Sequence, residues 1–338
     1  PAGGELLPVT AAAGDTARPG PFPHREAPGR LDGPPVVLAL RALGLGDLLT
    51  AVPALRGLRR GFPDAHLVLV APAALAPLVA RIGAVDRLLP VPSAVHAPPG
   101  PLPDPGARPA LAVNLHGHGP QSTTALRRLR PARLWAYGTP GSPPWRDDEH
   151  EVDRWCRLLA WYGCPVDRDD LYLDTGTADA PRPGPVLVHP GASTIERRWP
   201  ADRFAAVARA LAARGYPVQV TAGPAEEELA AWVAAAAGLP PTAVACSMDL
   251  DALTDLVASS PLVICGDTGV AHLATACRTP SVVIFGPQPP SRWGPPPNGR
   301  HRVLWDPADA RDPDPRPRRI GTADVLAAAE DLLATPVA

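Results

Sequence analysis

The stretch that decides the fold is Cys265-Gly266-Asp267-Thr268-Gly269-Val270-Ala271-His272-Leu273. An apolar run at 262–264 precedes it and predicts a strand, and an Ala-rich run to Cys277 follows it and predicts a helix. Free backbone N–H groups and the positive end of the helix dipole at such a turn can bind a diphosphate. The simpler interpretation is that Asp267 only caps the helix.

Strand-like and helix-like runs alternate on both sides of this turn. The predicted strands are 35–41, 66–70, 87–89, 110–114, 133–137, 186–189, 218–222, 242–245, 262–265 and 281–285. The predicted helices are 48–60, 73–82, 122–129, 149–162, 201–214, 225–237, 251–258, 270–277 and 323–333. This alternation predicts an α/β protein with mostly parallel sheets and helices on both faces. Pro53 is expected to kink the first helix or to mark a first turn.

The alternation predicts two domains of the same class. Residues 1–33 are Pro- and Gly-rich and are expected to form a disordered leader. A first domain at 34–166, a polar linker at 167–185 and a second domain at 186–320 follow, with 286–320 expected to be a loop. The last segment, 321–338, is expected to be a helix, with the first domain as one candidate docking surface. Ligands of such sheets bind beyond the carboxyl ends of the strands, so two facing domains predict one deep cleft.

Composition excludes several classes of function. The net charge of the 338 residues is −2, which argues against a nucleic-acid partner. Five cysteines are scattered without a C-x-x-C pair, as in proteins of a reducing cytoplasm. Apolar runs fall far short of the roughly 20 residues of a membrane helix, and the first residues do not resemble a secretory signal. We therefore expect a cytoplasmic protein without a transmembrane segment, with peripheral contact at the inner membrane face as a further option.

Two polar loops follow predicted strands at the edge where ligands bind. The first, Arg41-Ala42-Leu43-Gly44-Leu45-Gly46-Asp47, ends in a carboxylate that either caps the next helix or acts as a general base. The second, 188–200, carries the hydroxyls of Ser193 and Thr194 and the guanidinium groups of Arg197 and Arg198. Arginine binds phosphate oxygens in a bidentate way, so this loop predicts an anion site in which one of the two arginines takes part.

Two further segments complete the pattern. Thr221-Ala222-Gly223-Pro224-Ala225-Glu226-Glu227-Glu228 ends a strand and starts a helix. Its acidic residues favour the helix start, and Glu226 or Glu227 is also placed to bind a ribose hydroxyl. The fourth segment, 284–294, is a Pro-rich loop that ends in Ser291-Arg292-Trp293-Gly294.

Together these five segments resemble the heptosyltransferase-type enzymes of glycosyltransferase family 9. The shared pattern is R-x-x-x-x-G-D, H-P-G-A-S-x-x-x-R-W-P, G-P-x-E, D-T-G-x-x-H-L-A and F-G-P-x-x-P-x-R-W-G, in this order over residues 35–295. The resemblance implies a GT-B fold, in which two Rossmann-like domains face a cleft. It also implies transfer of a sugar, heptose or related, from a nucleotide diphosphate donor, with inversion and without a bound metal or other cofactor. The acceptor hydroxyl would lie on a glycan, a lipid or a small molecule.

The resemblance also assigns residues by position. It implies that Asp47 is the base and that Arg197 contacts donor phosphate. The other donor-site residues that it implies are Ser193, Thr194, Glu226, Met248, Asp267, Thr268, Gly269 and His272. On the acceptor side, in the first domain, it implies Gly46, Asn114 and His116. The sequence departs from the family at Asn114-Leu115-His116-Gly117, where Asp-Leu-Gln-Gly is common, and at Arg197, where lysine is common.

Other signals have competing interpretations. Asp249-Leu250-Asp251 and Asp312-Pro313-Asp314 spell D-x-D, but the first is placed as a helix N-cap and the second lies in a Pro-rich loop. His116 and His118 form a candidate metal pair without a third ligand. We therefore expect no metal site. A nucleotide-sugar 2-epimerase of the same architecture and a non-catalytic nucleotide-sugar-binding protein are the alternative functions.

Overall fold

The computed structural model describes residues 34–95, 99–176, 182–223, 225–312 and 316–334. The expected leader 1–33 lies outside the described residues. So do 177–181 of the expected linker, Pro313 and Asp314 of the second D-x-D sequence, and 335–338 of the last segment.

The first domain is a five-stranded parallel sheet of order β3-β2-β1-β4-β5. Its strands are β1 (Val36–Leu40), β2 (His66–Pro72), β3 (Arg87–Val91), β4 (Leu111–Asn114) and β5 (Leu134–Trp135). Its helices are α1 (Leu45–Thr50), α2 (Val52–Gly61), α3 (Ala76–Ile82), α4 (Pro120–Arg128) and α5 (Glu151–Trp161). Alternate side chains of β1 point to opposite faces of the sheet. Val37 and Ala39 belong to the same apolar cluster as α2, α3 and α5, whereas Leu38 and Leu40 pack with α4.

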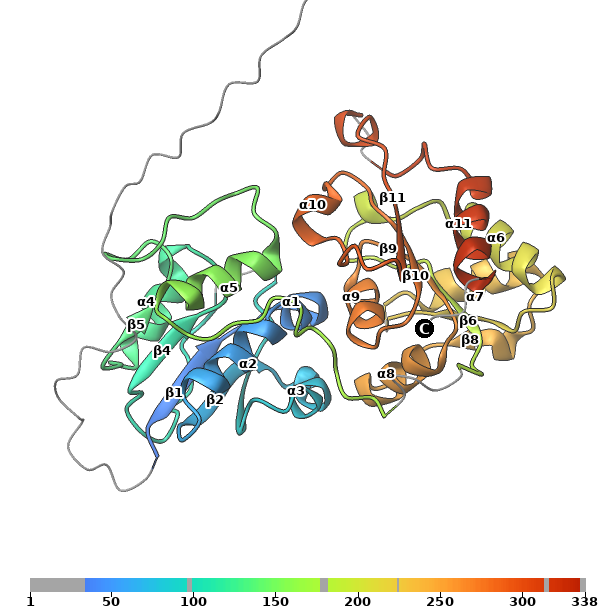
Figure 1. Cartoon of the computed structure of the whole chain (residues 1–338). Helices are drawn as coiled ribbons and strands as arrows, with labels where there is room; N and C mark the ends of the chain where they lie inside the picture. Colours follow the sequence, from blue (N-terminus) through green and yellow to red (C-terminus); the bar gives the residue numbers. More distant parts are fainter. Residues whose placement is uncertain (1–33, 96–98, 177–181, 224, 313–315, 335–338) are drawn as a thin grey trace, which may run out of the picture.

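The second domain is a six-stranded parallel sheet of order β11-β10-β9-β6-β7-β8. Its strands are β6 (Val186–His189), β7 (Val218–Thr221), β8 (Val244–Ala245), β9 (Val263–Gly266), β10 (Ser281–Ile284) and β11 (His301–Leu304). Its helices are α6 (Ala201–Ala213), α7 (Glu227–Ala237), α8 (Leu250–Ser259), α9 (Gly269–Ala276), α10 (Pro290–Trp293) and α11 (Thr322–Ala334). The expected α/β class is confirmed, and both sheets have the strand order of a Rossmann fold (Figure 1).

One expectation about the end of the chain is wrong, and one open alternative is decided against the first domain. The segment 286–320 is not all loop, because it contains α10 and the edge strand β11, which pairs with β10. Prolines on both sides of this short strand hide its pattern in the sequence. The last helix, α11, packs on the second domain rather than the first. Its Val325, Ala329 and Leu332 are buried in the apolar cluster that holds α6 and α7.

The first helix of the first domain is divided in two. The α1 segment ends at Thr50 and α2 begins at Val52, with Pro53 in its first turn, where a missing N–H costs no hydrogen bond. This confirms Pro53 as a first-turn residue. The break directs α1 toward the second domain while α2 stays on its own sheet (Figure 1).

The two domains meet along α1 and α9. Each helix contributes one glycine to this contact, and a side chain of the other helix packs directly against it. A Cβ atom on Gly46 would lie 2.5 Å from Cδ2 of His272, and one on Gly269 would lie 3.0 Å from Cδ2 of Leu45. One apolar cluster continues across this contact, from Leu48 and Leu49 in the first domain to Leu273 and Ala274 in the second. The glycines therefore let the two helices approach closely enough to share a core.

Candidate active site

A cavity of about 570 Å³ lies between the domains. In each sheet the strand order reverses at a switch point, between β1 and β4 in the first and between β6 and β9 in the second. Ligand sites of such sheets form where the loops leave a switch point. The loop after β1 and the loops after β6 and β9 all line this cavity.

The cavity brings together most of the residues that the sequence predicts for the site. Asp47 and Gly46 reach it from the first domain. The second domain contributes Ser193, Thr194, Arg197, Glu226, Met248, Asp267, Thr268, Gly269 and His272. Asn114 and His116 are not among its lining residues.

Asn114 does not fit its expected role at an acceptor. Its side chain is fully buried, and its amide nitrogen donates to the hydroxyls of Ser122 and Thr123 at 2.9 and 3.1 Å. Its amide oxygen accepts from the backbone N–H of His116 at 3.0 Å. This expectation is therefore wrong, because Asn114 uses its polar atoms to hold α4 and the loop after β4.

His116 lies behind the cavity wall. Its Nδ1 is buried without a hydrogen-bond partner among the described residues. Burial and the nearby charge of Arg41 lower the pKa of His116 to about 4, against an opposing effect of Asp47. The ring is therefore neutral at pH 7 and lies within electrostatic reach of Asp47.

Asp267 pairs with Arg197 instead of capping α9. The N-cap of α9 is Thr268, so the capping interpretation of Asp267 is wrong. The Asp267 carboxylate is nearly buried and lies 3.6 Å from Nη1 of Arg197, whose side chain is about one-third exposed. The pair places one guanidinium beside the N-terminus of α9, where both features favour an anion.

The neighbouring arginine and glutamate have separate roles. Arg198 donates to the carbonyl oxygen of Ala192 at 3.1 Å and to Oε1 of Glu226 at 2.9 Å, and it does not line the cavity. Glu226 does line it, and Glu227, the first residue of α7, does not. Of the two alternatives that the sequence leaves open at each motif, the cavity geometry favours Arg197 and Glu226.

Replacing Gly191 with alanine is expected to weaken nucleotide binding about tenfold with the fold preserved. A Cβ atom at this position would lie 1.9 Å from Oε2 of Glu226, so the carboxylate must leave the place where the Ala192 N–H binds it at 3.0 Å. Calorimetric titration with nucleoside diphosphates checks this, with Gly100→Ala as the control because its Cβ would meet nothing within 4 Å. Unchanged affinity in Gly191→Ala would contradict a ligand-binding role for Glu226.

Asp47 is held by its own helix and by a buried arginine. It lies in the first turn of α1, where its Oδ2 accepts the N–H of Gly44 at 3.1 Å, so it stabilises the helix start without being the N-cap. The fully buried Arg41 donates to the backbone oxygen of Asp47 at 2.9 Å and approaches its Oδ1 at 3.4 Å. The Asp47 side chain stays one-quarter exposed, toward the cavity.

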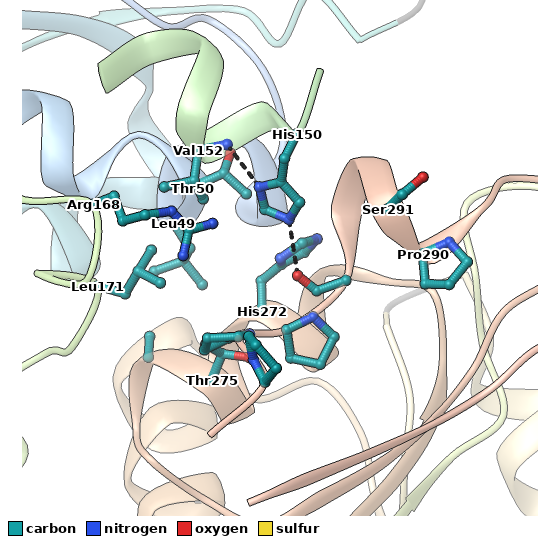
Figure 2. A pocket seen from close by; sticks show the side chains of 15 residues that line it. Leu49, Thr50, His150, Val152, Arg168, Leu171, His272, Thr275, Pro290 and Ser291 are labelled. Atoms are coloured by element: carbon teal, nitrogen blue, oxygen red, sulfur yellow. Dashed lines mark hydrogen bonds between the residues drawn. The ribbon is translucent and has the colours of Figure 1, made fainter. Parts of the chain in front are cut away.

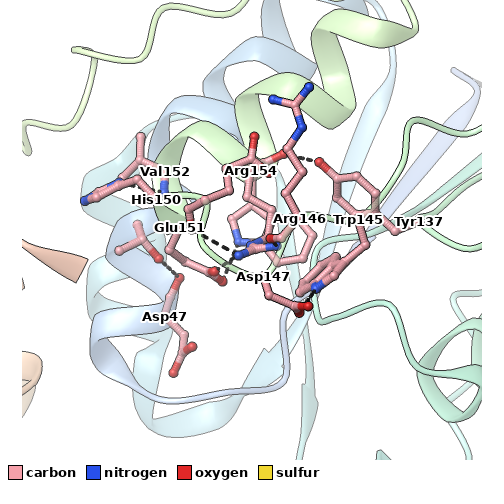
Figure 3. A network of polar contacts seen from close by, with 12 residues as sticks. Asp47, Tyr137, Trp145, Arg146, Asp147, His150, Glu151, Val152 and Arg154 are labelled. Atoms are coloured by element: carbon pink, nitrogen blue, oxygen red, sulfur yellow. Dashed lines mark hydrogen bonds and ion pairs between the residues drawn. The ribbon is translucent and has the colours of Figure 1, made fainter. Parts of the chain in front are cut away.

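Arg41 is itself held by the start of α5. Its Nη2 lies 3.0 Å from Oε1 of Glu151. The Glu151 carboxylate also accepts from Trp155 Nε1 at 2.8 Å. It accepts from Arg154 Nε at 3.0 Å as well (Figure 3). Burial raises the pKa of Glu151, but the charge and hydrogen bond of Arg41 outweigh it and the net pKa is lowered. Glu151 is therefore ionised at neutral pH, and the buried charges are matched.

Two histidines on the cavity wall are neutral at pH 7. Burial lowers the pKa of both His189 and His272 to about 4. The Nδ1 of His189 is 3.0 Å from the Thr221 hydroxyl, and the ring of His272 lies 6.0 Å from that of Trp293. His272 also borders a second cavity of about 210 Å³, which Thr50 and His150 line as well (Figure 2). The positive charge that faces a ligand therefore comes from Arg197 and not from these rings.

The free energy of unfolding is expected to fall as pH drops from 7 to 5. Below pH 6.5 the unfolded chain protonates histidines that the folded protein keeps neutral down to about pH 4, so protons favour unfolding in this window. His189 alone accounts for about 2 kcal/mol at pH 5. Urea denaturation of the unliganded protein at both pH values checks this, and His189→Asn should reduce the difference by that amount. An equal difference in the variant would contradict the assignment.

Sequence reasoning missed several residues that matter here. His189, Trp293 and Val95 line the cavity, and Glu151 and Arg154 support Arg41. His189 and Trp293 lie inside two of the quoted motifs, and this position could have identified them as site residues. Glu151 pairs with Arg41 across 110 positions of sequence, and no local pattern indicates such a pair.

Other sequence signals have structural explanations. Asp249 caps α8, as expected, because its carboxylate accepts the N–H of Ala252 at 2.8 Å. Cys265 is buried in β9, as expected, and all five cysteines are free. Within the described ranges, no three His, Cys, Asp or Glu side chains are grouped as a metal would require. Among the helices that the structure describes, none combines the length and apolar composition needed to cross a bilayer.

Comparison with known proteins identifies relatives of this chain. The model of glycosyltransferase family 9 (heptosyltransferase) matches residues 119–314. The chain is 34% identical over 160 residues to lipopolysaccharide heptosyltransferase 3 of Escherichia coli, covering 44% of this chain and 46% of the relative. It is 31% identical over 152 residues to lipopolysaccharide heptosyltransferase 1 of Pseudomonas aeruginosa, covering 43% and 42%. The chain thus spans less than half the length of these curated relatives.

Solved structures share the whole fold. A family 9 glycosyl transferase from Veillonella parvula matches 89% of this chain and 97% of its own, with a TM-score of 0.72 and 20% identity. ADP-heptose lipopolysaccharide heptosyltransferase II of Escherichia coli matches 88% and 98%, with a TM-score of 0.68 and 19% identity. These likenesses support the GT-B arrangement of two Rossmann-like domains. Since the family match spans more than half of the chain and includes the residues that the second sheet contributes to the cavity, the chain belongs to glycosyltransferase family 9.

Proposed function

We propose that this protein is an inverting, metal-independent glycosyltransferase that moves a heptose or related sugar from an ADP-linked donor to an acceptor hydroxyl. The acceptor hydroxyl belongs to a glycan, a lipid or a small molecule. The observation that carries the proposal is one cavity that places Asp47 from the first domain opposite Arg197 and the start of α9 from the second. Lipopolysaccharide heptosyltransferases among the relatives support heptose as the sugar.

The donor is held by the second domain. Glu226 is placed to accept from a ribose hydroxyl, and Met248 lines the same cavity, where an adenine would pack. Arg197 and the backbone N–H groups at Thr268 and Gly269 bind the diphosphate. These donors are fixed before the reaction, so they stabilise the charge that builds on the leaving diphosphate without reorganising.

The reaction is a single displacement. Asp47 removes the proton of the acceptor hydroxyl while its oxygen attacks the anomeric carbon from the face opposite the diphosphate. The bond from the anomeric carbon to the diphosphate oxygen breaks, and the nucleoside diphosphate leaves with both bonding electrons. One new glycosidic bond forms with inverted configuration, and the proton stays on Asp47. Contact between α1 and α9 closes the cleft around the reacting groups.

A donor screen followed by a transfer assay tests this function. ADP-heptose should raise the melting temperature above that given by GDP-, UDP- or dTDP-sugars, because a ligand stabilises the state that binds it. Release of ADP should then require an added acceptor, such as lipopolysaccharide core that lacks heptose. Conversion of the donor alone into its 2-epimer would indicate an epimerase. Donor binding without any turnover, abolished by Asp267→Ala, would indicate a binding protein.

Turnover is expected to continue in excess EDTA. The positive end of α9 and Arg197 supply charge beside the diphosphate, where a cation would otherwise be needed. Initial rates with EDTA and with added Mg²⁺ or Mn²⁺ check this. Complete loss of activity in EDTA, restored by either metal, would contradict a metal-independent mechanism.

A further inference from the structure

His150 makes hydrogen bonds to both halves of the molecule. Its Nδ1 accepts the backbone N–H of Val152 at 3.3 Å and so caps α5. Its Nε2 lies 3.0 Å from the carbonyl oxygen of Gly294, in the second domain (Figure 2). A carbonyl can only accept, and Nδ1 already accepts, so the proton is on Nε2 and the ring is the neutral Nε2–H tautomer.

The Gly294 end of this bond adjoins a residue of the 570 Å³ cavity, although Gly294 itself lines the smaller one. Gly294 follows Trp293 at the end of α10, and Trp293 lines the large cavity beside His272. The Gly294 N–H returns to the carbonyl of Pro290 at 2.6 Å, and a Cβ atom on Gly294 would lie 2.6 Å from the same oxygen. The turn is therefore tight, and the position of the Gly294 carbonyl follows that of α10 and Trp293.

The His150 end of the bond is linked to Asp47. The next residue, Glu151, binds Arg41 at 3.0 Å, and Arg41 donates to the backbone oxygen of Asp47 at 2.9 Å. The side chains of Glu151, Arg41 and Asp47 are buried or mostly buried and have little room to move. A displacement at the start of α5 therefore also displaces Asp47. A continuous series of contacts thus runs from Trp293 in the second domain to Asp47 in the first.

We propose that His150 is a positioning residue that makes the placement of Asp47 depend on domain closure over the donor. The bond to Gly294 forms only when the two domains are together, and it then fixes the start of α5 on which Arg41 and Asp47 rely. The proposal rests on the proposed function for its effect on rate. Its effect on closure does not depend on any turnover.

Two substitutions separate the capping role of His150 from the bond between domains. Asparagine is among the best N-cap residues, so His150→Asn keeps the cap, but its side chain is too short to reach Gly294. Glutamine places an amide nitrogen where the Nε2 of histidine lies, so His150→Gln keeps the bond to Gly294 and loses the cap. His66→Ala, on a half-exposed histidine at the start of β2, is the control for loss of a first-domain histidine.

Transfer kinetics, ADP titration and small-angle X-ray scattering are measured on all four proteins. We expect His150→Asn to lower kcat about five- to tenfold, the scale of one hydrogen bond, with ADP affinity unchanged. We expect its ADP complex to have a larger radius of gyration than that of the wild type. His150→Gln should keep wild-type kcat and scattering but melt at a lower temperature, and His66→Ala should match the wild type in kcat and scattering.

The opposite pattern, with kcat lost in His150→Gln and kept in His150→Asn, would show that only the cap matters. Equal losses in both variants, or no loss in either, would also overturn the proposal. If the wild-type protein transfers no sugar, the proposed function has failed and scattering alone decides the role of His150. Wild-type dimensions for His150→Asn with ADP would then reject it.

Discussion

Replacing Asp47 with asparagine is expected to lower kcat about 100- to 10,000-fold, which is the usual contribution of a general base. An amide cannot take up the acceptor proton. The fold should survive, because the amide oxygen can still accept the Gly44 N–H that Asp47 accepts at 3.1 Å. Steady-state rates with donor and acceptor, together with ADP affinity and melting temperature, check the prediction.

Asp324→Asn is the matched control for this substitution. Asp324 lies in the first turn of α11 and accepts the N–H of Gly321 at 2.9 Å, the same arrangement as Asp47 and Gly44. It lies outside the cavity, so its variant should lose no activity. Near-normal turnover in Asp47→Asn would reject Asp47 as the base. Of the two alternatives, His116 and another carboxylate of the first domain, the carboxylate would then be favoured, because His116 does not line the cavity.

Replacing Arg41 with methionine is expected to lower the free energy of unfolding by about 3 to 5 kcal/mol, the usual cost of removing one partner from a buried ion pair. Arg41 is fully buried, and it donates hydrogen bonds to the Glu151 carboxylate, the Leu115 carbonyl and the Asp47 backbone oxygen. Urea denaturation at pH 7 measures the loss. Arg214→Met should cost no more than about 1 kcal/mol, because its pair with Glu330 is nearly half exposed.

A second variant keeps this prediction informative if Arg41→Met is too unstable to study. Adding Glu151→Gln neutralises the carboxylate that has lost its Arg41 partner, so the double variant should be more stable than the sum of the two single losses implies. Strict additivity would mean that Arg41 and Glu151 do not depend on each other. A small loss in Arg41→Met alone would mean that the Arg41 contacts do not stabilise the first domain.

The sequence was sufficient for the architecture because the alternation of strands and helices is local. The runs at 66–70 and 270–277 carry their own periodicity, and both became the expected elements β2 and α9. Strand β11 was not predicted from the sequence, because its four residues lie between proline-rich segments and form a strand by pairing with β10. The sequence left the docking surface of helix α11 open, since an Ala-rich helix does not indicate which partner buries it, and the structure places it on the second domain.

The candidate site was predictable where a single local motif determines the position of its side chains. The loops around Arg197, Asp267 and Glu226 each bring their side chains to the ends of strands, and they meet in one cavity. Asn114 was expected there because of its position in the family pattern, but the identity of the residue does not reveal that its amide donates to two hydroxyls of α4. The pairs Arg41–Glu151 and His150–Gly294 join residues more than 100 positions apart and needed the folded structure.

The glycine contact between α1 and α9 sets a condition for chimaeric enzymes. A natural way to change the acceptor of such a transferase is to exchange its first domain for that of a relative. Gly46 fits beneath His272 and Leu45 fits against Gly269, so each helix is shaped for the other. A transplanted first domain with a methyl group in place of the Gly46 hydrogen would place that carbon only 2.5 Å from Cδ2 of His272 and push the two helices apart. Successful domain exchange would therefore have to transfer α1 and α9 as a matched pair.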